Sequence, residues 1–433
     1  MKQLLSSPAR LTASGFLLLI IVGTALLMMP FAGGASLLSA LFTATSAVSL
    51  TGLIVEDTAT FYSPAGQVII LVLIQLGGLG IMSLASLSGY VLTGRISFRA
   101  RKTGAYEGRP ITSGGIRRTL IFTFAFTAVV EATIAILVGA RLMFGYGYSF
   151  PRAAWEGIFH AISAFNNAGF STHSDNLVSF AADAWILLPL AAVLIGGGLG
   201  FPVWAELVRR KISITGRMTL WATGILLAFG MVFFACAEWR GVLGPMPLGQ
   251  KLLNAFFASA SPRTAGFNAV DYGQAHPITL MGTDMLMFLG GGSAGTAGGI
   301  KVTTFCVLLA AMAAEFRGRK NTTIGHRSIP HTVTRQALAL SVAGVAVVVV
   351  GVATLRIFDP QFTADQVTFE VISAFATSGL STGITADLSA TSKLVLCMIM
   401  YLGRVGPTTL VAALAARTVD RRFSYPEERP FIG

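Results

Sequence analysis

Long apolar segments are the feature of this sequence that most restricts its fold. About 20 residues are enough to cross a bilayer as a helix. Eight segments reach that length, near residues 14–33, 65–93, 118–144, 183–208, 218–237, 279–315, 336–358 and 392–416. Of all side chains, 54% are hydrophobic and only 12% are charged, too apolar a composition for one water-soluble core. The sequence therefore predicts an all-α integral membrane protein with eight transmembrane helices.

The first apolar segment has one alternative interpretation. Lys2 and Arg10 precede it and the small residues "FAGGA" follow it, as in a cleaved signal sequence. We favour a retained helix, because the repeat described below includes this segment.

The charges of the chain indicate its orientation. There are 31 Lys and Arg residues against 19 Asp and Glu. With a cytoplasmic amino terminus, most basic residues fall on the cytoplasmic side, in the segments 95–118, 209–217, 317–335 and 417–429. This is the positive-inside pattern, and it predicts a multi-pass protein with both termini in the cytoplasm and no nucleic-acid partner. The outer loops, to which Arg263 is assigned, are net acidic and would concentrate cations.

A few charged residues lie inside the apolar segments. Lys301 and Arg404 are the basic ones, and a cation at that depth costs about 2.5 to 3.5 kcal/mol, so it usually faces a bundle interior or a watery path. Snorkelling to the interface or a structural salt bridge is the alternative for each. Glu131 is either a proton or cation relay, or a hydrogen-bond partner of a neighbouring helix.

The sequence shows no group of residues typical of an enzyme active site. Cys236, Cys306 and Cys397 lack metal or redox spacing. The five histidines are scattered, and we expect His160 to pack behind a loop and not to bind a ligand. No paired carboxylates or nucleophile with a base stand out, so we predict no catalytic residue, and a transport protein is favoured over an intramembrane enzyme or a scaffold.

A short motif recurs four times between successive apolar segments. Its copies are "ALFTATSAVSLTGL" (40–53), "GIFHAISAFNNAGF" (157–170), "NAFFASASPRTAGF" (254–267) and "TFEVISAFATSGL" (368–380). Each copy places a Phe ten residues before a Gly that a large apolar residue follows, and three copies place a Ser six residues before that Gly. The exception carries Ala260 at the serine position. The chain is therefore a fourfold repeat of helix, short segment, helix.

Each short segment is too short to span a bilayer, so we predict that it forms a re-entrant hairpin. Helix-start residues precede all four: Ser36, Pro151, Pro247 and Thr363. The returning backbone is tolerated at that depth only where it lines a polar cavity, and glycine supplies the positive φ that such a turn needs. Four turns around one axis would form a ring of carbonyl oxygens that replaces the hydration shell of a monovalent cation. Helix packing through small residues is the alternative for these glycines.

The motifs resemble those of a known family. "SLTGL", "FNNAGF", "PRTAGF" and "ATSGLS", with "GGGSAGTAGGIKVTT" at 290–304 and "YLGRVGPTTL" at 401–410, resemble the Trk/Ktr/HKT superfamily of potassium transporters, most closely the membrane subunits of bacterial Ktr systems. The resemblance covers nearly the whole chain. It implies four M1-P-M2 units (helix, re-entrant pore loop, helix) around a pseudo-fourfold pore, at 1–95, 96–211, 212–320 and 321–433.

The resemblance also implies the roles of particular residues. The potassium filter would be formed by Leu50, Thr51, Gly52, Asn167, Ala168, Gly169, Thr264, Ala265, Gly266, Thr377, Ser378 and Gly379. The glycine run would break the second helix of the third unit and form an intramembrane gate, with Gly290, Gly291, Gly292, Gly295, Gly298, Gly299, Lys301 and Arg404. Lys301 would hold this loop or repel cations, and Arg404 would hinder tight ion binding. The run lacks the Gly-Lys-Ser/Thr order of a phosphate-binding loop.

The expected function is potassium uptake across the bacterial plasma membrane, through a channel-like pore subunit. Gly52 favours K⁺, because Ser at this position accompanies sodium transport in the plant branch of the family. Sodium-selective or sodium-coupled transport is the alternative, and Na⁺ could be an activator. The resemblance implies a homodimer and a cytosolic nucleotide-binding regulatory ring (KtrA-like), docked on the loops at 94–117 and 317–335.

Overall fold

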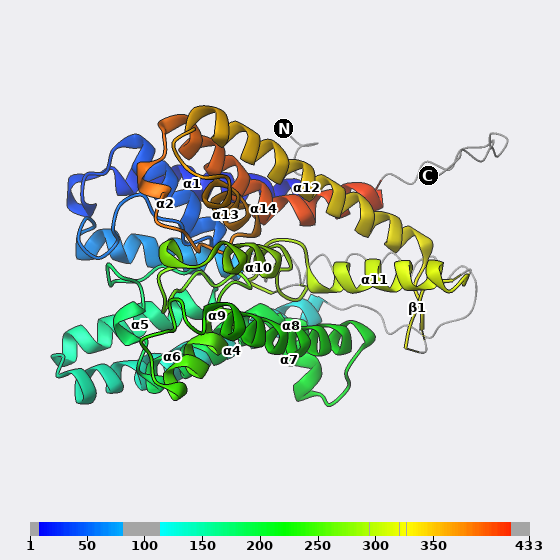
Figure 1. Cartoon of the computed structure of the whole chain (residues 1–433), viewed down its shortest axis with the longest axis horizontal. Helices are drawn as coiled ribbons and strands as arrows, with labels where there is room; N and C mark the ends of the chain where they lie inside the picture. The colour runs from blue at the N-terminus through cyan, green and yellow to red at the C-terminus, as the bar shows by residue number, and fades with distance from the viewer. Residues whose placement is uncertain (1–7, 81–112, 294, 320, 326, 417–433) are drawn as a thin grey trace.

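The computed structural model describes residues 8–80, 113–293, 295–319, 321–325 and 327–416, and the described chain is mostly helical (Figure 1). The predicted docking loop at 94–117 and both chain ends lie wholly or largely outside these residues. The helices outside the four repeated short segments are α1 (Pro8–Leu27), Pro64–Gly80, α4 (Ser113–Tyr146), α6 (Ala184–Leu199), α7 (Phe201–Val208), α8 (Ile214–Glu238), α10 (Pro277–Phe288), α11 (Val302–Phe316), α12 (His331–Phe358) and α14 (Ala390–Ala416).

Four helices lie in the repeated short segments and are called the short helices below; short elements complete the described chain. The short helices are α2 (Leu37–Ser49), α5 (Phe150–Phe165), α9 (Leu248–Ala260) and α13 (Ala364–Ala376). The 3-10 turns are η1 (Pro30–Ala32), η2 (Val178–Phe180), η3 (Tyr272–Gln274) and η4 (Thr385–Asp387). An antiparallel pair, β1 (Thr323–Ile324) and β2 (Arg327–Ser328), joins α11 to α12.

Length and composition show that several helices suit a membrane. Among the described residues, three helices are long and apolar enough to span one: Ile121–Tyr146, Ile214–Glu238 and His331–Phe358. They expose large apolar side chains such as Ile136, Trp221 and Val350, as lipid-facing helices do. The second predicted segment, 65–93, is described only to residue 80. The total of eight spans stays a prediction.

The fourth predicted span, 183–208, is not one straight helix. It is divided into α6 and α7, which meet at 96°. Gly200 lies at the break with φ +89°, a conformation that ends a helix, and Pro202 lies in the first turn of the next helix. The sixth predicted span is also interrupted, between α10 and α11, where the glycine run predicts a break.

The four short helices begin close to the predicted positions. Ser36 caps α2 by accepting a hydrogen bond from the amide of Ser39, and Thr363 forms a capping box with Gln366 in α13. Pro247 is the N-cap of α9. Helix α5 has its N-cap one residue before Phe150, so its proline lies in the first turn. Local sequence therefore determines where each short helix starts.

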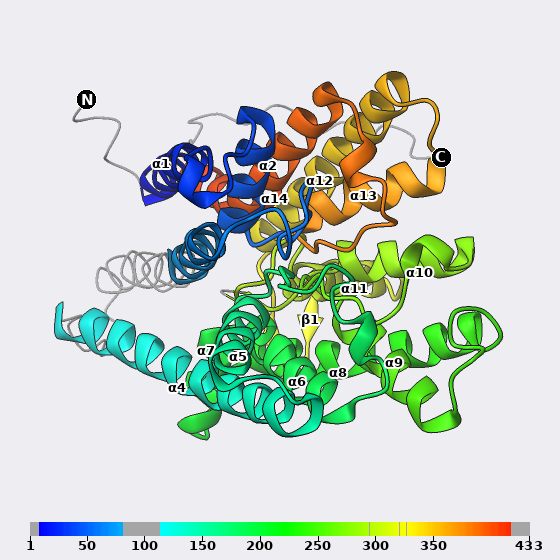
Figure 2. The same ribbon diagram turned by 90° about the vertical axis from the view of Figure 1, so that its left-hand side faces the viewer.

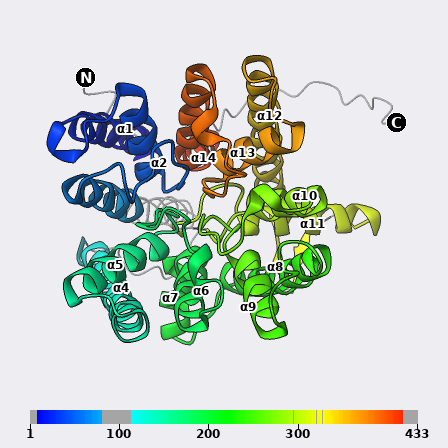
Figure 3. The same cartoon turned by 60° about the vertical axis from the view of Figure 1, so that its left-hand side comes forward.

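In the part of the chain that the structure describes, the core consists of four hydrophobic clusters, each of which includes residues of two short helices. These clusters pack α2 against α1, α5 against α4 and α6, α9 against α8, and α13 against α12 and α14. Seen from the side, the chain falls into groups of helices arranged about a centre where the loops meet (Figures 2 and 3). The packing therefore points the ends of the short helices toward one another.

Candidate functional site

The turns after the four short helices share one backbone conformation. In each turn, a non-glycine residue with positive φ lies two positions before a glycine with positive φ. The φ values are 58° and 92° for Leu50 and Gly52, 56° and 71° for Asn167 and Gly169, 79° and 72° for Thr264 and Gly266, and 50° and 87° for Thr377 and Gly379. Left-handed non-glycine residues cost about 1 to 3 kcal/mol each and persist only where their surroundings impose them. Four equivalent strained positions are a mark of a functional site.

Serine hydroxyls brace the first and fourth turns in the same way. The Oγ of Ser46 accepts a hydrogen bond from the amide of Gly52 at 3.0 Å, and the Oγ of Ser373 accepts one from the amide of Gly379 at 3.0 Å. All these groups are buried. The structure thus supplies the reason for a serine six residues before the glycine: it satisfies the glycine amide, which the turned backbone leaves without a helical partner.

The second and third turns are braced through a carbonyl instead. The hydroxyl of Ser163 donates to the carbonyl of Phe170 at 2.7 Å. In the third turn, where Ala260 replaces serine, the next residue, Ser261, donates its hydroxyl to the carbonyl of Phe267. The rule of a serine six residues before the glycine did not predict this role of Ser261, because Ser261 lies only five residues before Gly266.

The four glycines form a closed ring in chain order, because each lies against the turn that carries the next glycine. A Cβ atom on each glycine would meet a carbonyl oxygen of that neighbouring turn. For Gly52 this Cβ would lie 2.4 Å from the carbonyl oxygen of Ala168, and for Gly169 it would lie 2.9 Å from that of Ala265. For Gly266 it would lie 2.3 Å from the carbonyl oxygen of Ser378, and for Gly379 it would lie 2.0 Å from that of Thr51. Each turn therefore touches the next, and the fourth returns to the first. No side chain fits at these positions without moving the neighbouring backbone.

All twelve residues predicted to form the filter lie buried in these turns. The structure thus brings together four segments that are distant in the sequence. Each short helix directs its carboxyl-terminal end, which carries partial negative charge, toward the ring. Backbone carbonyls and helix ends of this kind are suited to a desolvated cation.

The glycine-rich loop between α10 and α11 contacts the helix ends from which the second and fourth turns begin. A Cβ on Gly298 would lie 2.0 Å from the Oγ1 of Thr377, and one on Gly299 would lie 3.3 Å from the Cα of Ala376. The Oγ1 of Thr296 donates to the carbonyl of Phe165 at 3.5 Å. The loop therefore lies against the ring, on the side of the short helices.

Backbone hydrogen bonds hold this loop in place. Its two ends are joined by the amide of Gly290 and the carbonyl of Ile300, 2.9 Å apart. Its middle docks on the end of α6, where the amide of Gly292 donates to the carbonyl of Gly198 at 2.8 Å. A Cβ on Gly197 would lie 2.1 Å from the carbonyl oxygen of Phe165. The α6 glycines were missed in the sequence, although "GGGLGFP" marks a helix end.

Lys301 and Arg404 both donate hydrogen bonds to carbonyls of the loop. Arg404, on α14, is only 3% exposed, and its Nη1 donates to the carbonyl of Thr296. The Nζ of Lys301 donates to the carbonyl of Ala297. Among the described residues, neither cation forms a salt bridge, and the Nε and Nη2 of Arg404 make no hydrogen bond. Two cations that lack carboxylate partners thus lie at the loop.

Arg263 was assigned to an outer loop, and this prediction is wrong. It is 6% exposed, and its Nη2 donates to the Oγ1 of Thr223 on α8 at 3.0 Å. The reason is its place within the third turn, directly before Thr264, where the backbone carries the guanidinium toward α8. Arg263 is therefore a buried residue of the third turn and not part of an exposed loop.

Glu131 and His160 make hydrogen bonds behind the second turn. Glu131 accepts from the Nε2 of Gln75 and from the Nδ2 of Asn166, each at 3.2 Å, and so joins α4 to the helix Pro64–Gly80 and to the turn. These contacts fit the hydrogen-bond interpretation of Glu131. His160 is buried, with its Nε2 3.0 Å from the Oγ of Ser171.

Comparisons with known proteins agree with the geometry. The family model "TrkH: Cation transport protein" matches residues 11–422. The chain is 38% identical to the Ktr system potassium uptake protein B of Bacillus subtilis (strain 168), over 99% of this chain and 97% of that protein. It is 36% identical to the potassium/sodium uptake protein NtpJ of Enterococcus hirae, over 99% and 97%.

A solved structure shows the same fold. The potassium transporter TrkH from Vibrio parahaemolyticus superposes with a TM-score of 0.71 at 20% identity, over 93% of this chain and 85% of that one. The resemblance predicted from the motifs is confirmed. The chain belongs to the TrkH family of cation transport proteins, and it is a membrane transporter and not an enzyme.

Proposed function

We propose that this chain is the pore subunit of a Ktr-type system that takes up K⁺ across the bacterial plasma membrane, with the glycine ring as its filter. The observation that carries this proposal is the closed ring of Gly52, Gly169, Gly266 and Gly379. The names of the relatives, which include potassium uptake proteins, support K⁺ as the ion.

The proposed permeation step is dehydration at the ring. K⁺ exchanges its water for carbonyl oxygens of the four turns, and the turns are pre-formed, because their strained residues are buried and braced. Eight residues before the glycines contribute these carbonyls: Leu50, Thr51, Asn167, Ala168, Thr264, Ala265, Thr377 and Ser378. No covalent step is involved.

The proposed gate is the loop 290–301. It touches the ends of α5 and α13, and both Arg404 and Lys301 bind its carbonyls. Two cations near the permeation path raise the electrostatic cost of placing K⁺ there. Opening would require the loop to leave the Gly198 carbonyl and the Arg404 guanidinium.

The proposed partners are a second copy of the chain and a cytosolic nucleotide-binding regulatory ring. Arg317, Arg319 and Arg327, between α11 and α12, and Arg335, near the start of α12, are all exposed. In the proposed orientation, with both termini in the cytoplasm, this basic surface faces the cytosol and is available to a partner. Two relatives are named as proteins of a Ktr system, which fits a multi-subunit assembly.

Transport of Na⁺ is the second candidate, because one relative is named a potassium/sodium uptake protein. Na⁺ would be either a carried ion or an activator. Flux measured with each ion alone and with both together separates these roles from transport of K⁺ only.

Uptake of radioactive Rb⁺ into proteoliposomes tests the proposal. Wild-type protein should take up Rb⁺, and excess K⁺ should compete more strongly than Na⁺. Gly52→Ser should lose this preference by roughly tenfold or more, because a left-handed non-glycine residue costs about 1 to 3 kcal/mol and its Cβ would meet the Ala168 carbonyl. The matched control is Gly224→Ala on α8, where a Cβ would meet nothing within 4 Å.

Two results would contradict the proposal. One is wild-type protein that carries no monovalent cation. The other is Gly52→Ser with unaltered ion preference while the Gly224→Ala control behaves normally.

A further inference from the structure

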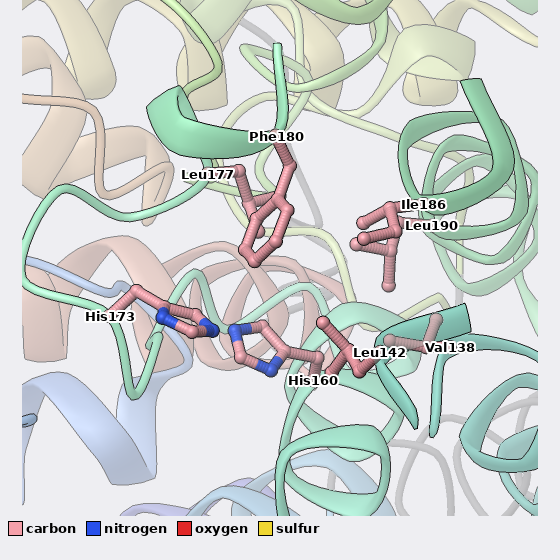
Figure 4. Close-up of a pocket in the computed structure, with 8 residues that line it drawn as sticks. All are labelled: Val138, Leu142, His160, His173, Leu177, Phe180, Ile186 and Leu190. Carbon is pink, nitrogen blue, oxygen red and sulfur yellow. The ribbon is translucent and has the colours of Figure 1, made fainter. Parts of the chain in front are cut away.

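A cluster of three potential metal ligands lies behind the second turn, apart from the ring and the loop. Glu156 and His160 are four residues apart on α5 and therefore share one helix face. His173 lies four residues after Gly169, and its ring stacks on that of His160, with 5.4 Å between centroids (Figure 4). One ligand atom from each of the three residues lies within 4.8 Å of the others.

The distances within the cluster are close to those of a metal site. The Oε2 of Glu156 is 3.4 Å from the Nε2 of His173 and 3.7 Å from the Nδ1 of His160. Zinc binds imidazole nitrogen and carboxylate oxygen at about 2.0 to 2.2 Å in a tetrahedron, so neighbouring ligand atoms lie about 3.3 to 3.5 Å apart. The separation of 3.4 Å meets this requirement and that of 3.7 Å is slightly longer, while all three ligand atoms lie within 4.8 Å of one another, so binding requires side-chain movement.

One ring nitrogen of the cluster is buried without a hydrogen bond. The Nε2 of His173 has no hydrogen-bond partner among the described residues, although the whole side chain is 13% exposed. Leaving such an atom unpaired costs about 1 to 3 kcal/mol. The Oε2 of Glu156 lies 3.4 Å from this nitrogen, so a cation bound by both groups would give the nitrogen a partner.

The neighbours of His160 orient its other nitrogen toward the same point. The hydroxyl of Ser171 donates to the carbonyl of Asn176 at 3.1 Å, so its oxygen is left to accept the Nε2–H of His160 at 3.0 Å. The Nδ1 of His160 lies 2.8 Å from the backbone carbonyl of Glu156, which can only accept a hydrogen bond, so without a metal ion a proton on Nδ1 is donated to this carbonyl. A metal ion at Nδ1 would displace that proton and leave the remaining proton on Nε2, held by Ser171, as for metal-binding histidines whose second nitrogen is held by a hydrogen bond.

The surroundings supply a place for a fourth ligand. His160 and His173 line a cavity of about 10 Å³ with apolar walls that include Leu177 and Phe180 (Figure 4). A space of this size holds about one water molecule. Arg152 approaches the other carboxylate oxygen of Glu156, with 4.0 Å between Nε and Oε1, whereas Oε2, which also accepts the hydroxyl of Thr172, faces the two histidines. Three protein ligands with one water is a common zinc arrangement.

We infer that Glu156, His160 and His173 form a binding site for a divalent transition-metal ion of the Zn²⁺ class, and that its occupancy lowers ion flux. The link to the ring is short. Asn176, whose carbonyl accepts the Ser171 hydroxyl, donates its Nδ2 to the carbonyl of Gly169 at 3.3 Å. A divalent cation behind this turn also replaces a local negative charge with a positive one. The effect on flux rests on the proposed function, whereas the binding site does not.

Co²⁺ titration of the purified full chain in detergent tests the site. Co²⁺ takes the place of Zn²⁺ and has visible absorption bands typical of tetrahedral N and O ligands. We expect one equivalent per chain, displaced by Zn²⁺, with affinity at least tenfold weaker in His173→Gln and in Glu156→Gln. His276→Gln, at an exposed histidine on the N-cap of α10, is the matched control and should bind as wild type.

The binding site is overturned if wild-type protein shows no tetrahedral band, or if His173→Gln and Glu156→Gln both keep wild-type affinity. Because the wild-type titration alone decides the first point, misfolding of a variant cannot mask the result. The His173 variant alters the most exposed of the three side chains, which keeps disturbance of the core small.

Rb⁺ uptake with added Zn²⁺ tests the effect on flux. Zn²⁺ should lower uptake several-fold in wild-type and His276→Gln proteoliposomes and should not do so in His173→Gln. Zn²⁺ that binds without lowering wild-type uptake would contradict the regulatory half of the inference. Wild-type protein that takes up no Rb⁺ even without metal would contradict the proposed function instead, and the Co²⁺ titration would still decide the site.

Discussion

Single hydroxyl groups determine the shape of the ring. Ser46 and Ser373 accept hydrogen bonds from the ring glycines Gly52 and Gly379, and these amides are buried. Removing such an acceptor leaves the amide unsatisfied, at a cost of about 1 to 3 kcal/mol. The turn would then populate other conformations, and the carbonyl oxygens would no longer be held at one separation.

We therefore expect Ser46→Ala to reduce the preference for K⁺ over Na⁺ by roughly tenfold, since 1.4 kcal/mol corresponds to a factor of ten. Competition of the two ions for Rb⁺ uptake measures this preference. Ser328→Ala, at an exposed serine of β2, is the control. An unchanged ion preference in Ser46→Ala would show that the hydroxyl does not support the filter.

For single residues, the sequence predicted which ones form the four turns but not every contact that holds these turns in place. The Phe, Ser and Gly spacing predicted which residues form the four turns, because each turn is a local structure. The role of Ser261 and the burial of Arg263 were not predictable in this way. Both depend on how the third turn packs against Phe267 and α8, which involves contacts outside the motif.

Among the elements, the loop 290–301 is held by Arg404 and by the end of α6. The guanidinium of Arg404 donates to the carbonyl of Thr296, and hydrogen bonds from charged groups contribute about 1.5 to 3 kcal/mol. Losing this bond and its charge favours an open loop. We expect Arg404→Gln to raise Rb⁺ uptake roughly tenfold and to alter its voltage dependence.

Two variants serve as controls for Arg404→Gln. Arg404→Lys keeps the charge and loses the guanidinium geometry, so it separates the two contributions. Arg356→Gln removes an exposed arginine at the last turn of α12 and should leave uptake unchanged. If Arg404→Gln showed wild-type uptake and voltage dependence, the gating role of Arg404 would be wrong.

The loops after the first and second turns are joined by Asp57, whose Oδ2 accepts the hydroxyl of Ser174 at 2.5 Å. Burial alone would raise the pKa of Asp57, but hydrogen bonds from Ser174, Ala59 and Thr60 bring this pKa below its ordinary value of 3.8. Because the folded pKa lies below the unfolded one, the ionised carboxylate stabilises the fold above about pH 4, and this stabilisation is lost as the pH falls through the lowered pKa.

Asp57→Asn should therefore lower the thermal unfolding midpoint in detergent at pH 7, by no more than about 2 °C for a link worth less than about 1 kcal/mol. The difference from wild type should shrink toward pH 3. Asp387→Asn, at an exposed carboxylate in η4, is the control. A difference that stayed constant from pH 7 to pH 3 would contradict the assignment to the ionised carboxylate.

The sequence predicted where helices begin and break more reliably than how these elements pack against one another. Helix-start residues and hydropathy gave the short helices and the break between α10 and α11. The break at Gly200 was not predicted, because apolar residues continue on both sides of it and hydropathy does not detect a bend. The hydrogen bond between the loop 290–301 and Gly198 joins residues nearly a hundred positions apart. Local sequence patterns do not predict such contacts.

For the whole molecule, the central feature is the closed order of the ring. Each turn contacts the next, and the last contacts the first. Each turn therefore has its neighbours on both sides only when all four turns are in place. The fourfold repeat suggested this arrangement, but spacing alone could not distinguish a closed ring from four separate helix contacts. The four hydrophobic clusters around the ring hold the short helices that carry it.

The most direct measurement is anomalous X-ray diffraction from crystals of the protein grown with Rb⁺ in place of K⁺. The account predicts anomalous peaks on the axis enclosed by Gly52, Gly169, Gly266 and Gly379, within coordination distance of the carbonyl oxygens of the four turns. A well-ordered ring with no peak on this axis, or peaks only elsewhere in the protein, would contradict it.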